Sequence, residues 1–278
     1  MIVDAHQHFW DPAATTYSWL TDELAAIRRR FGPEDLAPEL RAAGVVATIL
    51  VQTRSSLDET REFLALAAGS SFVRGVIGWV DLTDLAVSDV LAELQAGPGG
   101  ERLVGIRHQV HNEPDPAWLA RPPVRRGIAA VGAAGLAFDL LVRARELPTA
   151  VELARRLPDV RFVVDHLAKP PIAARLREPW ATRIGGFATL ENVACKLSGL
   201  VTEAHWATWR VQDLLPYVDR GLEVFGPGRL LFGSDWPACL LAAEYGDVVD
   251  AARQLTAALS PSERSGLFAG NAIATYRL

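Results

Sequence analysis

The sequence predicts a (β/α)8 TIM barrel of the α/β class, and three observations support this fold. Eight short apolar runs rich in β-branched residues recur along the 278 residues. Segments with the periodicity of amphipathic helices lie between them, and this alternation is typical of a parallel sheet. The chain is also slightly longer than the roughly 250 residues of a common barrel of this kind. We therefore expect one barrel domain over residues 1–278.

The predicted elements follow the chain in regular order. The strands are expected at Ile2–Ala5, Val45–Gln52, Val73–Val80, Leu103–Val110, Leu136–Val142, Val160–Asp165, Val193–Ser198 and Leu230–Gly233. The helices are expected at Ser56–Ala68, Asp84–Gln95, Val124–Ala134, Pro148–Leu157, Val211–Phe225 and Pro261–Leu278. An open doubly wound sheet is the alternative, but no GxGxxG sequence follows the first strand, and eight strands are enough to close a barrel.

Local signals mark where helices begin and end. Ser56 with Glu59, and Ser260 with Glu263, match the capping box, in which each side chain bonds the backbone N–H of the other residue. Glycines stand at 44, 135 and 226, where a helix should stop before the next strand. Glycine is favoured there because it readily adopts the left-handed conformation.

Composition excludes several classes of protein. The net charge is −5 and the short run Arg28–Arg30 is the only basic block, so no nucleic-acid partner is expected. No apolar stretch is long enough to cross a membrane, and the N-terminus lacks the pattern of a signal peptide. Two cysteines provide no disulfide framework. We expect a cytoplasmic protein with a small-molecule partner, and the sequence leaves its oligomeric state open.

The connection Phe9–Pro33 is long, whereas most other connections are short, and it carries Trp10, Tyr17 and Trp19. Long loops in compact domains often form binding loops or lids. The alternative is a loop that is fixed by its own aromatic side chains.

His6 and His8 follow the first strand, and alternation along an extended chain places both imidazoles on one face. Asp235 follows the eighth strand, which closure of a barrel places beside the first. Active sites of these barrels lie at the carboxyl ends of the strands. The three side chains are therefore expected to meet, with Asp235 as the general base and the histidines holding a substrate, a water molecule or a metal ion.

Other polar side chains occupy similar positions in later strands. His166 follows the sixth strand, and Lys196 lies within the seventh, where an unpaired charge would be costly. Each is a candidate catalytic residue, with a hydrogen-bonded core histidine and a buried ion pair as the alternatives. Asp139 in the fifth strand is expected to bind substrate hydroxyls or to pair with Lys196 or Arg107.

Arg107 and His108 are adjacent at the end of the fourth strand, so their side chains should point to opposite faces. The sequence does not decide which one faces the site. Arg107 suits the binding of a developing oxyanion through its planar fork, and its alternative is a salt bridge to a neighbouring helix. His108, Trp10 and Trp236 are candidate substrate-binding residues.

The motifs Asp4–Pro12, Gly105–His108, Asp165–His166, Cys195–Leu200 and Phe232–Pro237 together resemble a known family. The chain is similar to the amidohydrolase superfamily (amidohydrolase family 2), in its branch of sugar-lactone hydrolases related to L-fuconolactonase and L-rhamnonolactonase. The resemblance spans nearly the whole chain. It implies a (β/α)8 barrel that opens a lactone ring, and matches His6, His8, His166 and Asp235 to the family's first-, sixth- and eighth-strand positions.

The fifth strand departs from the family pattern. Many members carry a metal-binding histidine there, whereas this sequence reads Leu136–Leu141 without histidine. The resemblance therefore argues against a two-metal centre. It leaves two possibilities open: no required cofactor, or a single zinc-like divalent ion held by His6, His8 and Asp235.

The function predicted from the sequence is hydrolysis of a sugar lactone to its hydroxy acid. Asp235 takes a proton from the attacking water, and Arg107, Lys196 and the histidines stabilise the oxyanion. The first alternative is a metal-dependent non-oxidative decarboxylase of an aromatic acid, as in other members of the superfamily. The second is a ligand-binding barrel without enzymatic activity.

Overall fold

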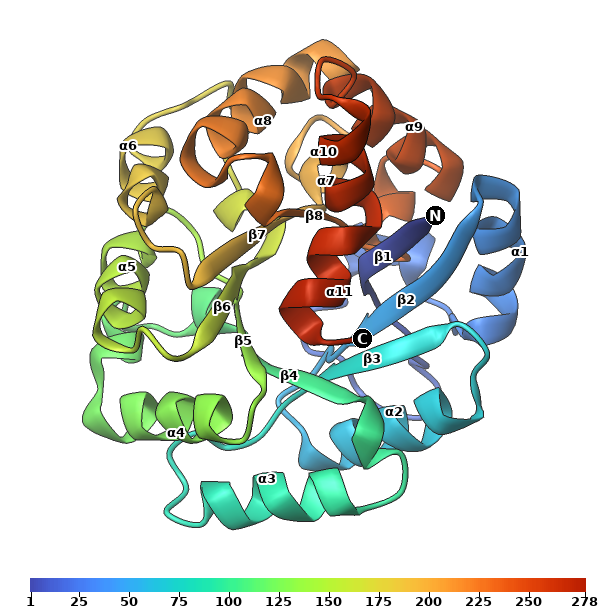
Figure 1. Ribbon diagram of the computed structural model, residues 1–278. Coiled ribbons are helices and arrows are strands. Elements are labelled where there is room, and N and C mark those ends of the chain that lie inside the picture. Colours follow the sequence, from blue (N-terminus) through green and yellow to red (C-terminus); the bar gives the residue numbers. More distant parts are fainter.

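The computed structural model describes residues 1–278 and contains one eight-stranded parallel sheet in the order β1 to β8 (Figure 1). The strands are β1 (Ile2–Gln7), β2 (Val45–Val51), β3 (Val73–Gly78), β4 (Leu103–His108), β5 (Ala137–Leu140), β6 (Arg161–Val164), β7 (Val193–Leu197) and β8 (Leu230–Phe232). Eight strands were expected, and eight are found. Their bounds differ from the predicted ones by a few residues at the ends.

Helices surround the sheet on its outer side (Figure 1). Those between the strands are α1 (Pro33–Ala43), α2 (Leu57–Gly69), α3 (Val87–Ala96), α4 (Pro122–Ala133), α5 (Leu147–Arg156), α6 (Trp180–Ile184), α7 (Leu200–Glu203) and α8 (Val211–Phe225). The C-terminal helices are α9 (Tyr245–Leu255), α10 (Pro261–Ser265) and α11 (Asn271–Tyr276). No helix has both the length and the apolar character that a membrane span requires.

The barrel closes through hydrogen bonds between the C-terminal end of β1 and the segment that follows β8. The N–H of Asp235 donates to the carbonyl of His6 (2.8 Å), and the N–H of His8 donates to the carbonyl of Trp236 (2.7 Å). The (β/α)8 prediction is thereby confirmed. Closure also brings together two polar segments that lie at opposite ends of the sequence.

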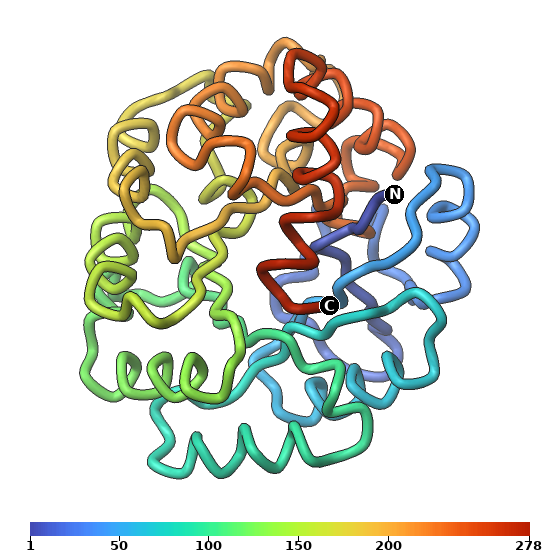
Figure 2. Tube along the Cα trace, in the orientation of Figure 1, coloured from blue at the N-terminus to red at the C-terminus, as the bar shows by residue number.

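Two apolar clusters hold the layers together. The larger one lies between the strands and the surrounding helices. The smaller one fills the barrel interior with alternate strand residues such as Val3, Ala5 and Ile49. The C-terminal α11 adds Tyr276 to this inner cluster, and the Cα trace shows the final turn lying across the barrel opening (Figure 2). The apolar interior thus occupies one end of the barrel and leaves the other end for polar groups.

The predicted helix signals are found with one difference. Gly44, Gly135 and Gly226 all have positive φ, and Ser260 with Glu263 forms the complete capping box. The hydroxyl of Ser56 accepts the N–H of Glu59 (3.2 Å), as expected. The Glu59 carboxylate, however, accepts the N–H groups of Thr53 and Arg54 (2.8 and 2.9 Å) instead of the N–H of Ser56. Glu59 therefore secures the turn after β2.

Candidate active site

A polar pocket lies at the carboxyl ends of the strands, with about 660 Å³ of empty space open to solvent. Charged and hydrogen-bonding side chains form most of its wall. Its lining residues are His8, Trp10, Trp19, Thr53, Arg107, Gln109, His111, Asn112, Leu141, His166, Lys169, Asp235 and Ala238. This volume falls in the range of small-molecule sites.

His8 lines this pocket, His6 lies directly behind it, and both side chains are buried. Their Nε2 atoms are 3.1 Å apart. Nδ1 of His8 lies 2.7 Å from the carbonyl oxygen of Val51, so this nitrogen is the donor and Nε2 of His8 is the nitrogen that faces the pocket cluster.

Asp235 lies in the segment that follows β8, and its carboxylate faces the Nε2 atoms of His6 and His8. Its backbone has a φ of +59°, an uncommon value for a residue other than glycine. Oδ1 lies 3.5 Å from Nε2 of His8 and 3.7 Å from Nε2 of His6. Burial raises the pKa of Asp235, but the adjacent His166, His8 and His6 outweigh this effect and hold the pKa well below its ordinary value. The carboxylate is therefore ionised at neutral pH.

The imidazole of His166 approaches the carboxylate of Asp235 from the turn after β6. Four consecutive residues from His166 to Lys169 have positive φ, and this left-handed turn aims the imidazole at Asp235. Nε2 of His166 is 3.9 Å from Oδ1 of Asp235, and Nδ1 is 2.8 Å from Oγ of Ser198. Burial lowers the pKa of His166 to about 4, so the imidazole is neutral at pH 7.

Of the adjacent pair at the end of β4, Arg107 faces the pocket. Its Nη1 donates to Oδ2 of Asp165 (2.9 Å), and its Nη2 donates to Oε1 of Gln52 (2.8 Å). His108 points away and stacks on Trp118, with ring centroids 4.2 Å apart. The alternation along β4 therefore places the guanidinium, and not the imidazole, beside His6.

Lys196 and Asp139 lie beneath the pocket and do not line it. Nζ of Lys196 forms ion pairs with Asp139 and with Asp165 (3.0 Å), and it lies 3.1 Å from Nδ1 of His6. The hydroxyl of Tyr276 donates to Asp139 (2.9 Å). Burial raises the pKa of Asp139 to about 6. These groups form a charged layer that supports His6 from below.

The aromatic candidates lie in different environments. Trp10 lines the pocket, and its Nε1 donates to the carbonyl of Ile27 (3.1 Å). Trp236 lies outside the pocket and packs edge-on against Phe9 and Phe31. Trp19 was expected only as part of a candidate binding loop, and in the structure it also lines the pocket. Its Nε1 donates to the carbonyl of Thr53 (3.1 Å). One wall of the site is therefore aromatic.

The structure adds residues that the sequence reasoning did not select. Asp165 lies in the motif Asp165–His166 without a predicted role of its own, and in the structure it pairs with both Arg107 and Lys196. Gln52 ends the second predicted strand, and its position there was a usable signal. The polar residues Gln109, His111, Asn112 and Lys169, which line the pocket, were also not selected, because they lie in loops where alternation gives no guide.

The three proposed metal ligands fit one divalent ion. The separations of 3.1, 3.5 and 3.7 Å among Nε2 of His6, Nε2 of His8 and Oδ1 of Asp235 are close to those of atoms that share one zinc ion at about 2.0–2.2 Å. The other ring nitrogen of His8, Nδ1, donates its N–H to the carbonyl of Val51, as the second nitrogen of a metal-binding histidine usually does. The only titratable side chain of β5 is Asp139, which is already paired with Lys196.

A buried carboxylate, three imidazoles and a guanidinium at the carboxyl ends of the barrel strands define a hydrolytic type of site. The family model described as "Amidohydrolase" matches residues 3–278, and the chain belongs to this family.

Named relatives extend over almost the whole chain. L-fucono-1,5-lactonase of Burkholderia ambifaria is 41% identical, covering 99% of this chain and 95% of that protein. L-fucono-1,5-lactonase of Burkholderia multivorans is 38% identical, covering 99% and 96% respectively. A crystal structure of a Burkholderia multivorans amidohydrolase with bound zinc is 36% identical, with a TM-score of 0.93, and covers 100% of this chain and 99% of that one.

Proposed function

We propose that this protein hydrolyses a sugar 1,5-lactone to the open hydroxy acid, with L-fucono-1,5-lactone as the first substrate to test. The observation that carries the proposal is the ionised Asp235 on the floor of a pocket with polar and aromatic walls. The two Burkholderia L-fucono-1,5-lactonases, which match along nearly their whole length, support the substrate.

The walls of the pocket suit an uncharged, hydroxylated ring. Trp10 and Trp19 offer aromatic faces to the C–H face of such a ring, and the polar loop residues Gln109, His111 and Asn112 offer partners to hydroxyl groups. The cations in the lining already have carboxylate partners, because Arg107 pairs with Asp165 and Lys169 pairs with Glu203.

Asp235 acts as the general base. It accepts a proton from water as the water oxygen bonds to the lactone carbonyl carbon. The Arg107 guanidinium and the imidazoles of the pocket stabilise the oxyanion, whereas Lys196 acts only through His6, since it does not line the pocket. The C–O bond of the ring then breaks, and Asp235 returns its proton to the leaving oxygen.

A carboxylate with so low a pKa is a weak base, so stabilisation of the oxyanion must supply much of the rate enhancement. His6, His8 and Asp235 would hold a divalent ion where one binds, and such an ion supplies Lewis acidity to a carbonyl oxygen and lowers the pKa of water.

A pH-indicator assay over a panel of lactones tests the proposal. The panel should contain L-fucono-1,5-lactone, other aldonolactones and a dicarboxylate lactone, each with and without chelator. We expect acid release with the aldonolactones and the hydroxy acid as product. Absence of acid release from every aldonolactone, or release of carbon dioxide from an aromatic acid instead, would contradict the proposal.

A further inference from the structure

Ser198 follows β7 and lies directly behind His166, on the side remote from Asp235. Its side chain is buried, with 3% of the residue exposed. Oγ lies 2.8 Å from Nδ1 of His166, and this is the only hydrogen bond that the Ser198 side chain makes.

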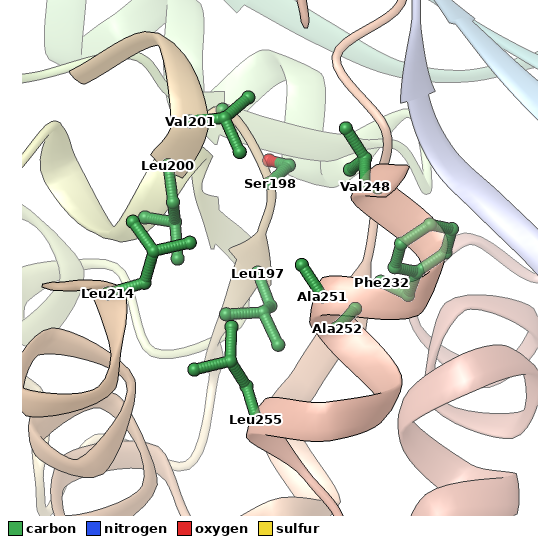
Figure 3. Close-up of a pocket in the computed structure, with 12 residues that line it drawn as sticks. Leu197, Ser198, Leu200, Val201, Leu214, Phe232, Val248, Ala251, Ala252 and Leu255 are labelled. Carbon is green, nitrogen blue, oxygen red and sulfur yellow. The ribbon is translucent and has the colours of Figure 1, made fainter. Parts of the chain in front are cut away.

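The other surroundings of Ser198 are apolar. An apolar cavity that opens to solvent lies between β7, β8, α8 and α9, with about 320 Å³ of empty space that includes part of this solvent, and Ser198 is at its edge (Figure 3). Its wall is formed by aliphatic side chains such as Leu200, Val201, Leu214 and Val248. None of these side chains can accept a hydrogen bond. Nδ1 of His166 is therefore the acceptor available to the hydroxyl hydrogen of Ser198.

We propose that Ser198 is a positioning residue that donates its hydroxyl hydrogen to Nδ1 of His166 and thereby holds the imidazole as the tautomer with its hydrogen on Nε2. The proposal rests on the proposed lactone hydrolysis for its catalytic consequence, but the tautomer itself can be observed without any substrate.

The opposite tautomer fits the structure less well on both sides of the ring. With the hydrogen on Nδ1, the imidazole would donate to Oγ, and the hydroxyl hydrogen of Ser198 would be left without an acceptor in a buried site. Nε2 would then direct its lone pair at the carboxylate of Asp235, 3.9 Å away. With the hydrogen on Nε2, both conflicts disappear. Nδ1 accepts the hydroxyl hydrogen of Ser198, and the N–H of Nε2 faces the carboxylate of Asp235.

This tautomer separates the roles of the two residues. His166 presents an N–H to the pocket and cannot accept a proton at Nε2, so it donates a hydrogen bond to the lactone oxygen that becomes negative. Asp235 accepts one proton of the attacking water and returns it to the ring oxygen when the C–O bond breaks. The other hydrogen of that water stays on the new carboxylic acid, which ionises in solution.

The test compares Ser198→Ala with Ser198→Thr. The alanine variant lacks the hydroxyl, whereas the threonine variant keeps it and can direct its extra methyl group toward the apolar cavity (Figure 3). Two-bond ¹H–¹⁵N correlation spectra of ¹⁵N-histidine-labelled protein report the tautomer, with His166→Gln used to assign the signal. Ser262→Ala, at an exposed serine, serves as the matched control.

We expect the Nε2–H tautomer of His166 in the wild type, in Ser198→Thr and in Ser262→Ala, and its loss or mixture with the other tautomer in Ser198→Ala. The kcat of Ser198→Ala should fall roughly 10- to 100-fold with little change in KM, as for other partners that orient a functional histidine. An Nδ1–H tautomer in the wild type would overturn the proposal even if Ser198→Ala failed to fold. So would an unchanged tautomer in Ser198→Ala. A correct tautomer shift without lactone hydrolysis by the wild type would overturn only the proposed function.

Discussion

Gly199 approaches His166 so closely that a β-carbon at position 199 would lie 2.6 Å from Nδ1 of the imidazole. The same β-carbon would lie 3.0 Å from Oδ2 of Asp235. The backbone of Gly199 also has a φ of +63°, which other residues adopt at a cost of about 1–2 kcal/mol. Glycine at this position therefore allows the side chains of His166 and Asp235 to lie next to each other.

Replacing Gly199 with alanine should displace His166 and Asp235 and lower kcat on the order of 100-fold, because small misplacements of reacting groups are costly. Gly228→Ala is the matched control, since a β-carbon there meets no atom within 4 Å. Steady-state kinetics and urea unfolding of the two variants check this prediction. Equal kcat values for Gly199→Ala and Gly228→Ala would contradict it.

His111 should make the stability of the protein depend on pH. Burial, together with nearby Lys169, Arg143 and Arg107, lowers the pKa of His111 to about 3. The unfolded chain, with an ordinary histidine pKa of about 6.5, binds the proton first as the pH falls. The contribution of neutral His111 is therefore complete above pH 6.5 and is lost as the pH falls toward 3.

Urea unfolding at pH 7 and pH 5 tests this effect. The wild type should lose more stability over this range than His111→Gln, by about 2 kcal/mol. His205→Gln, at an exposed histidine, should behave as the wild type does. Identical pH dependence in the wild type and His111→Gln would show that His111 is not held neutral.

Trp19 should contribute to substrate binding more than to the chemical step. The side chain lines the aromatic wall but lies outside the cluster around Asp235. Trp19→Ala should raise KM about 3- to 10-fold and change kcat little, because an aromatic contact is worth about 0.5–1.5 kcal/mol. Trp206→Ala, outside the pocket, is the control. A fall in kcat with unchanged KM would argue against this role.

Zinc should bind at the position between His6, His8 and Asp235. We expect one ion per chain by elemental analysis and calorimetry, and loss of this binding in His8→Ala. His108→Ala should keep the ion, because His108 stacks on Trp118 outside the cluster. Unchanged zinc affinity in His8→Ala, or a wild type that binds no zinc, would contradict the assignment of these ligands.

Barrel topology explains why much of the site could be predicted from the sequence. Parallel strands present their carboxyl ends at one face, and closure places the eighth strand beside the first. These two rules suffice to bring Asp235 to His6 and His8. Alternation within β4 likewise requires Arg107 and His108 to diverge, although it does not say which one points inward.

The rest depends on features that a linear pattern does not contain. The left-handed turn from His166 to Lys169 follows no periodicity, and neither does the packing of the loop that carries His111. The pairing of Lys196 with Asp139 and Asp165 depends on the register of three strands. The final helix adds Tyr276 to this layer from the far end of the chain.

The most direct test of the account is the kcat of Asp235→Asn on L-fucono-1,5-lactone. This change removes the proton acceptor and keeps the size of the side chain, so kcat should fall roughly 10²- to 10⁴-fold. Circular dichroism and the urea midpoint verify that the variant is folded. A folded Asp235→Asn variant with near-normal kcat would contradict the assignment of Asp235 as the base.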